Sequence, residues 1–201
     1  MFSLLDSRRA GLRARYAEPH RAYHGQAHVD ALLRALAGLG DAVTDPAAIE
    51  LAIWYHDAIY DPAARDNEAR SADLLRTEMA GLAHPARLDA AVLMVRLTAE
   101  HALTPQVPPA QRADCALFLD LDMAVLGAAP AVFDDYERGI AAEYVPVHGA
   151  DAYRTGRTAF LRTLLERPRL FLTDRFDAAL HMPARANIGR ALMQASSVRP
   201  H

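Results

Sequence analysis

Apolar residues recur at the spacing of a helix along almost the whole chain. Val29, Leu32 and Leu36 fall on one helical face, and Gly38 follows them as a terminator. The alternating pattern typical of strands is scarce, whereas alanine, leucine and arginine are plentiful. The pattern therefore predicts an all-α fold, with helices over residues 3–17, 28–37, 46–60, 67–79, 85–100, 110–126, 130–144 and 151–166 and a last one after Thr173.

No internal repeat, low-complexity block or linker interrupts these periodic segments. A chain of 201 residues is long enough to bury a substantial core as one unit. We therefore expect a single-domain helical bundle over residues 1–195. The short polar end, residues 196–201, is expected to be a frayed tail.

Charge and cysteine content exclude several classes of protein. The net charge of -3 gives no global basic surface, so no nucleic-acid partner is expected. Cys115 is the only cysteine, which excludes an intramolecular disulfide and a thiolate zinc cage. No signal peptide and no stretch of membrane-spanning length is found, so a cytoplasmic protein without a membrane partner is expected. Monomer and homodimer both stay open.

A histidine and an aspartate stand side by side at the end of one apolar stripe. His56 is the next position on the face that carries Ile49 and Ile53, and Asp57 follows it. A buried imidazole beside a carboxylate is costly unless both are satisfied, and a metal ion would satisfy both. The alternative is a core histidine bonded to a backbone carbonyl, with Asp57 capping a turn.

Two further segments place polar residues at inward positions. His28 lies one turn before Leu32 on its apolar face. Segment 110–126 is apolar nearly all round but contains Asp120 and Asp122, and buried carboxylates require a cation, either an arginine or a metal. Asp122 shares the heavier apolar stripe, whereas Asp120 lies about 160° round the helix. Two imidazoles and two carboxylates suit a divalent transition metal such as manganese, iron, cobalt or zinc.

The order His28, His56-Asp57, Asp122 on separate helices resembles the HD superfamily of metal-dependent phosphohydrolases. The resemblance covers residues 16 to about 190 and implies an HD-type helical fold. Six further motifs of the chain resemble a bacterial family of predicted HD phosphohydrolases. These motifs are Arg21-x-Tyr23-His24, Tyr55-His56-Asp57-Ala58-Ile59-Tyr60-Asp61, Asn67-Glu68-x2-Ser71-Ala72, Asp120-x-Asp122-Met123, Tyr153-x2-Gly156-Arg157 and Ala184-Arg185-x-Asn187.

The resemblance implies a metal-dependent enzyme that hydrolyses a phosphate ester of a small molecule, for example a nucleotide. It implies one divalent ion, with a second possible, and the metal ligands His28, His56, Asp57 and Asp122. Asp61 or Glu68 would accept the proton of the attacking water. The candidate substrate-binding residues are Arg21, His24, Arg157 and Arg185. For each arginine the alternative is a solvated side chain or a structural ion pair, and for His24 a surface or capping role.

Two other functions stay open at this point. In dinuclear HD variants, which include di-iron oxygenases, His84 or His101 would join His24 to hold a second ion. A non-catalytic sensor would bind a nucleotide through the same site. Tyr23, Trp54 and Tyr60 either line a pocket of nucleobase size or pack in the core.

Overall fold

The computed structural model describes residues 2–197 and contains helices and no strand within them. The predicted all-α class is thus confirmed for this part of the chain. The chain divides into two compact units, Met1–Asp122 and Met123–His201, and each is described by itself. The single domain expected over residues 1–195 stays a prediction.

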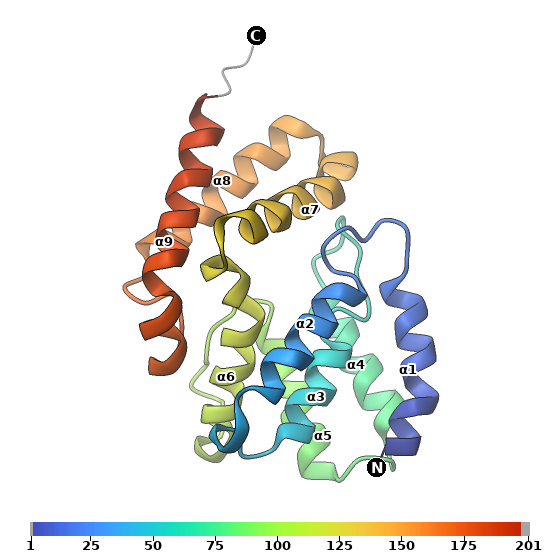
Figure 1. The fold of residues 1–201 in the computed structure, drawn as a ribbon. Helices are drawn as coiled ribbons and strands as arrows, with labels where there is room; N and C mark the ends of the chain where they lie inside the picture. The colour runs from blue at the N-terminus through green and yellow to red at the C-terminus, as the bar shows by residue number, and fades with distance from the viewer. Residues whose placement is uncertain (1, 198–201) are drawn as a thin grey trace. The chain divides into compact units, whose positions relative to one another are not determined.

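In the described part of the first unit, residues 2–122, there are six helices and two 3₁₀ turns (Figure 1). In chain order they are α1 (Phe2–Tyr16), α2 (Gln26–Ala37), η1 (Gly40–Ala42), α3 (Pro46–Tyr55), α4 (Asn67–Met79), α5 (Pro85–Leu97), η2 (Pro109–Gln111) and α6 (Arg112–Met123). The second unit begins at the last residue of α6 and contains η3 (Ala124–Gly127), α7 (Pro130–His148), α8 (Ala150–Glu166) and α9 (Asp174–Ser197).

Helix α3 is the centre of the first unit. It packs against α1, α2, α4 and α5, and seven of its ten residues are buried: Ala48, Ile49, Leu51, Ala52, Ile53, Trp54 and Tyr55. A helix that is apolar all round is stable only when neighbours cover every face. The periodic faces of the surrounding helices supply that cover.

The N-terminal end of α3 is held by three carboxylate contacts. Asp45 caps the helix by accepting a hydrogen bond from Ala48 N at 3.1 Å. Arg87 of α5 donates its Nε to both oxygens of the Asp45 carboxylate, at 2.9 and 2.8 Å. The buried Asp114 of α6 accepts the backbone N–H groups of Thr44 and Asp45, at 2.9 and 2.7 Å. Helices α3, α5 and α6 are therefore fixed to one another at this end.

Several helix ends differ from the predicted ones. Helix α3 ends at Tyr55 rather than at residue 60, and segment 110–126 is divided into η2, α6 and η3. Helix α7 runs on to His148 with Pro146 inside it. Helix α9 includes residues 196 and 197, where the frayed tail was expected to begin, and the rest of that expected tail, 198–201, lies outside the described residues.

The core of the second unit brings η3 against α9. The buried Asn187 donates its Nδ2 to the carbonyl oxygens of Leu126 and Ala128, both at 2.9 Å. Gly127 lies so close to α9 that a Cβ placed on it would stand 2.6 Å from Leu180 Cβ and 2.9 Å from Leu180 O. Asn187, which the sequence singled out only as part of a familiar motif, thus ties these two elements together.

No single helix among residues 2–197 is both long and apolar enough to span a membrane, although segments 109–127 and 130–148 would meet the length and composition criteria if taken together.

The close approach at Gly127 predicts opposite effects for two Gly→Ala substitutions. Gly127→Ala should lower the free energy of unfolding by about 1–3 kcal/mol, since the new methyl group meets a backbone carbonyl that cannot move aside. Gly156→Ala, at an exposed position of α8 with nothing within 4 Å, should raise it by about 0.5–1 kcal/mol through helix propensity. Urea denaturation of both variants checks this, and equal effects would contradict the packing at η3.

Candidate metal centre

Four predicted ligand residues come together in the first unit. His28 lies in the first turn of α2, His56 is the C-cap residue of α3, Asp57 follows it, and Asp122 lies in the last turn of α6. Phe118, one turn before Asp122, packs edge-on against the His56 ring with 6.0 Å between centroids. The apolar stripe of α6 therefore sets the position of Asp122 against the end of α3.

The side-chain atoms of these residues converge on one point. His28 Nε2 lies 3.1 Å from His56 Nε2 and 3.1 Å from Asp122 Oδ1. His56 Nε2 lies 3.0 Å from Asp57 Oδ2 and 3.7 Å from Asp122 Oδ1, and His28 Nε2 lies 3.9 Å from Asp57 Oδ2. One ligand atom each from His28, His56 and Asp122 lies within 4.8 Å of the others. Residues 28, 56 and 122 thus meet although the chain separates them widely.

Hydrogen bonding directs the second nitrogen of His56 into this cluster. His56 Nδ1 lies 2.9 Å from the carbonyl oxygen of Ile53. Because a carbonyl only accepts, Nδ1 carries the proton and donates it, so in the neutral ring Nε2 holds a lone pair that faces His28 and Asp122. The backbone contact considered as an alternative to metal binding is therefore present, and it is the contact that orients histidine ligands in metal sites.

The spacing of the donor atoms fits a divalent ion. Two atoms that each lie about 2.1 Å from one ion are about 3.0 Å apart at a right angle and about 3.4 Å apart at the tetrahedral angle. The separations from 3.0 to 3.9 Å within the cluster fall around these values. Neutral imidazole and carboxylate suit manganese, iron, cobalt or zinc. The residues present therefore fit the ion that the sequence predicts.

Burial and opposite charges shift the pKa values of the cluster in a consistent sense. Burial by itself lowers the pKa of His56, but the Asp57 carboxylate, helped by Asp122 and the Ile53 carbonyl, raises it to about 9. Burial opposes ionisation of Asp57 and Asp122, yet the neighbouring histidines hold the pKa of both carboxyls well below the ordinary value. Without an ion, the cluster is thus held together by an imidazolium between carboxylates.

Asp122, rather than Asp120, lies with the histidines. Both belong to α6, but the Asp122 carboxylate reaches His28 and His101. Asp120 is buried elsewhere on α6, with 2% of its surface exposed. The difference of two positions turns the second side chain to another side of the helix.

Arg21 positions the backbone around the cluster. Its side chain is fully buried and lies over the rings of Tyr16 and Tyr60. It donates Nη1 to the carbonyl oxygens of His24 and Asp57, at 3.0 and 2.7 Å. Its Nε donates to the Glu18 carboxylate at 3.0 Å. These contacts join the loop before α2 to the turn after α3, and the predicted contact of Arg21 with a phosphate stays a prediction.

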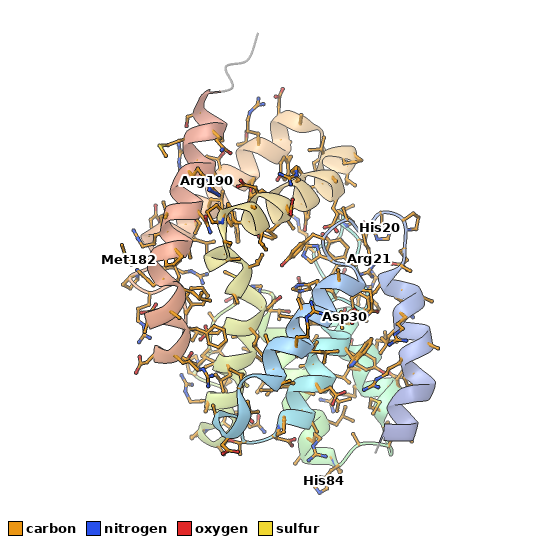
Figure 2. The ribbon with its side chains drawn as sticks, viewed as in Figure 1. His20, Arg21, Asp30, His84, Met182 and Arg190 are labelled. Atoms are coloured by element: carbon orange, nitrogen blue, oxygen red, sulfur yellow. The ribbon has the colours of Figure 1, made fainter. Side chains whose placement is uncertain are left out.

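The other histidines considered as ligands of a second ion lie in different places. The His24 ring packs on the Tyr60 ring, with 4.4 Å between centroids. His84 precedes α5 and lines a small cavity with Thr44 and Asp45 at the N-terminal end of α3, and Figure 2 shows it at the opposite end of the first unit from Arg21. A ten-residue helix is about 15 Å long, so His84 is too distant to share an ion with residues at the other end of α3. Of the two histidines considered as partners of His24, His84 is thus the one that the structure places away from the cluster.

His101 does reach the cluster, on its outer side. Its Nε2 lies 2.8 Å from Asp122 Oδ2, whereas His28 contacts the other oxygen of the same carboxylate, Oδ1. The helical period of 85–100 could not place it, because α5 ends at Leu97 and a turn follows.

The remaining predicted residues have diverse surroundings. Exposed Asp61 accepts the N–H of Ala63 at 2.9 Å within its own turn, and half-buried Glu68 lies in the first turn of α4. In the second unit, Arg157 forms an ion pair with Glu137, and Arg185 donates Nη1 to the carbonyl oxygen of Leu165 at 3.1 Å. The proton-accepting role and the phosphate contacts assigned to these four residues stay predictions.

Of the aromatic residues considered for a nucleobase pocket, Trp54 and Tyr60 are buried. Trp54 lies inside the central helix α3, so its packing role is explained by the core. Half-buried Tyr23 packs against the His28 ring with 4.9 Å between centroids, which places one aromatic face beside the cluster.

The contacts of Arg21 predict that Arg21→Lys weakens the centre. A lysine cannot reach the Glu18 carboxylate and both carbonyls at once, so we expect a loss of about 2 kcal/mol of stability and about tenfold weaker binding of Co²⁺. Thermal unfolding and calorimetric titration measure the two effects. Arg70→Lys, at an exposed ion pair with Asp66, is the matched control and should change neither. Unchanged stability and Co²⁺ affinity in Arg21→Lys would contradict the positioning role.

The raised pKa of His56 predicts that Co²⁺ binding strengthens as the pH rises from 6 to 8. The ion must displace the proton that His56 holds below about pH 9, so affinity should rise by up to about tenfold per pH unit. The stability of the metal-free protein should change with pH in the opposite direction and fall as the pH rises. The imidazolium stabilises the fold below about pH 6.5, and this contribution is lost as the pH rises through about 9. Calorimetry in buffers of different ionisation enthalpy counts the released protons, and pH-independent affinity would refute the assignment.

Comparison with known proteins adds no relative: no family model, no curated protein and no solved structure matches this chain.

Proposed function

We propose that this protein is a metal-dependent phosphohydrolase with an HD-type fold, which hydrolyses a phosphate ester of a small molecule such as a nucleotide. The observation that carries the proposal is the convergence of His28, His56 and Asp122, whose ligand atoms lie within 4.8 Å of one another. Although these buried or half-buried groups already contact one another, an imidazole from each of two segments and a carboxylate from a third are close enough together to bind one ion jointly.

The residue pattern adds support of a different kind. The same residues, with Asp57, occur in the order His, His-Asp, Asp that the HD superfamily uses for its ligands. When bound, a divalent ion polarises a phosphoryl oxygen and lowers the pKa of a water molecule toward neutrality. His28, His56, Asp57 and Asp122 would hold the ion, and Asp61 or Glu68 would accept the proton of the water.

The charge of the cluster suits this chemistry. Two carboxylates and two neutral imidazoles reduce the charge of a divalent ion to zero, so an anionic phosphate meets no net negative charge there. The hydrogen bond from His56 Nδ1 to the Ile53 carbonyl keeps the ring in one orientation while substrate binds. The hydrogen bond from Arg21 to the Asp57 carbonyl oxygen fixes the backbone of Asp57 next to His56.

The first test compares the metal content of the purified wild-type protein with that of two variants of ligand residues and two control variants. Wild type should hold about one equivalent of a transition metal. His56→Ala and Asp122→Asn should lose it, whereas Asp120→Asn and His84→Gln should keep it, since neither residue lies with the ligand atoms. Elemental analysis after loading with Mn²⁺ or Co²⁺ measures this. A wild type that binds no ion would overturn the proposal, and two equivalents would favour a dinuclear centre.

The second test is turnover by the loaded protein on a panel of nucleotides and other small phosphate esters. Phosphate release should require the ion and stop with a chelator. Asp61→Asn and Glu68→Gln should separate the two candidate proton acceptors, because the true one loses about 10²–10⁴-fold in kcat with its metal content intact. Intact metal binding without turnover on any ester would instead indicate a non-catalytic sensor.

A further inference from the structure

His101 has an unusual backbone conformation. Its φ of +46° is the one positive value at a non-glycine residue within the described part of the chain. Its N–H donates to the carbonyl oxygen of Leu97 at 3.0 Å, which continues the end of α5 by one more turn. Residues that follow a helix in this left-handed conformation are usually glycine or asparagine, because a Cβ crowds the next carbonyl. A histidine there is strained.

Strain of this kind persists where the surrounding structure compensates it, and it concentrates at functional sites. The compensation here is the contact of His101 Nε2 with Asp122 Oδ2, at 2.8 Å. The left-handed turn places the His101 imidazole within hydrogen-bonding distance of Asp122 Oδ2. The other oxygen of the same carboxylate, Asp122 Oδ1, lies 3.1 Å from His28 Nε2.

We infer that His101 is a positioning residue, which fixes the Asp122 carboxylate by donating to Oδ2 so that Oδ1 faces His28 and His56. The inference rests on the proposed metal centre and extends it to a residue outside the ligand set. The two oxygens of Asp122 have divided roles: one faces the ligand atoms of the cluster and the other is held from outside. A carboxylate ligand fixed in this way loses less freedom when the ion binds, which increases affinity.

Burial supports the division of roles. The side chains of His28 and His56 are only 5% and 1% exposed, whereas that of His101 is 27% exposed. His101 is therefore the most exposed of the three histidines, and it contacts the oxygen of Asp122 that His28 does not contact.

Three variants test the inference. His101→Gly removes the donor and also relieves the strained φ, so metal-free protein should unfold at the same or a higher temperature while the Kd for Co²⁺ rises about 10–100-fold. His101→Gln keeps a donor near the position of Nε2, so its Kd and its Co²⁺ absorption bands should stay close to those of wild type. His84→Gln is the control and should change nothing. In an Asp122→Asn background, His101→Gly should have no further effect on Co²⁺ affinity.

The outcomes separate the positioning role from its rivals. Unchanged Co²⁺ affinity in His101→Gly, with wild type binding the ion, would overturn this inference alone. Equal losses in His101→Gly and His101→Gln, with altered Co²⁺ absorption bands, would also overturn it and make His101 a nitrogen ligand. A wild type that binds no ion would overturn the proposed function itself.

Discussion

Charged groups withdrawn from water at the C-terminal end of α3 are the constraint on which the first unit depends. His56 and Asp57 stand where a fully buried helix ends, and the fold brings His28 and Asp122 to the same point. Each of these groups alone would carry a large desolvation cost. Together they satisfy one another, as the raised pKa of His56 and the lowered pKa of both carboxyls indicate. Helices α2, α3 and α6 are thereby held in one arrangement.

Contacts at the N-terminal end of α3 also fix this helix against its neighbours. The Asp45 cap, the Arg87 contact and the Asp114 carboxylate fix the start of the helix to α5 and α6. Contacts at both ends therefore fix the position of α3 against its neighbours, and with it the position of His56. Arg21 serves the same purpose for the turn after the helix, where it donates to the carbonyl oxygen of Asp57. Preorganisation of this kind is what a metal or a catalytic centre requires.

Polar residues of the second unit that the sequence singled out serve local packing. Asn187 joins α9 to the carbonyls on either side of Gly127, and Arg157 pairs with Glu137 while its guanidinium lies over Tyr136. These contacts lie within the second unit and hold its own elements together. The motifs that contain Arg157 and Asn187 therefore have a packing role within the second unit.

The sequence by itself determined the helical class, the buried character of α3 and α6, and the four polar residues at inward positions. These follow from local periodicity, because a side chain on the apolar face of a helix has to point inward. Tertiary structure alone decided that helix α3 stops at Tyr55, that Arg21 binds the Asp57 carbonyl, and that His101 rather than His84 reaches Asp122. Each depends on turns and on contacts between distant segments, and neither has a period that can be read along the chain.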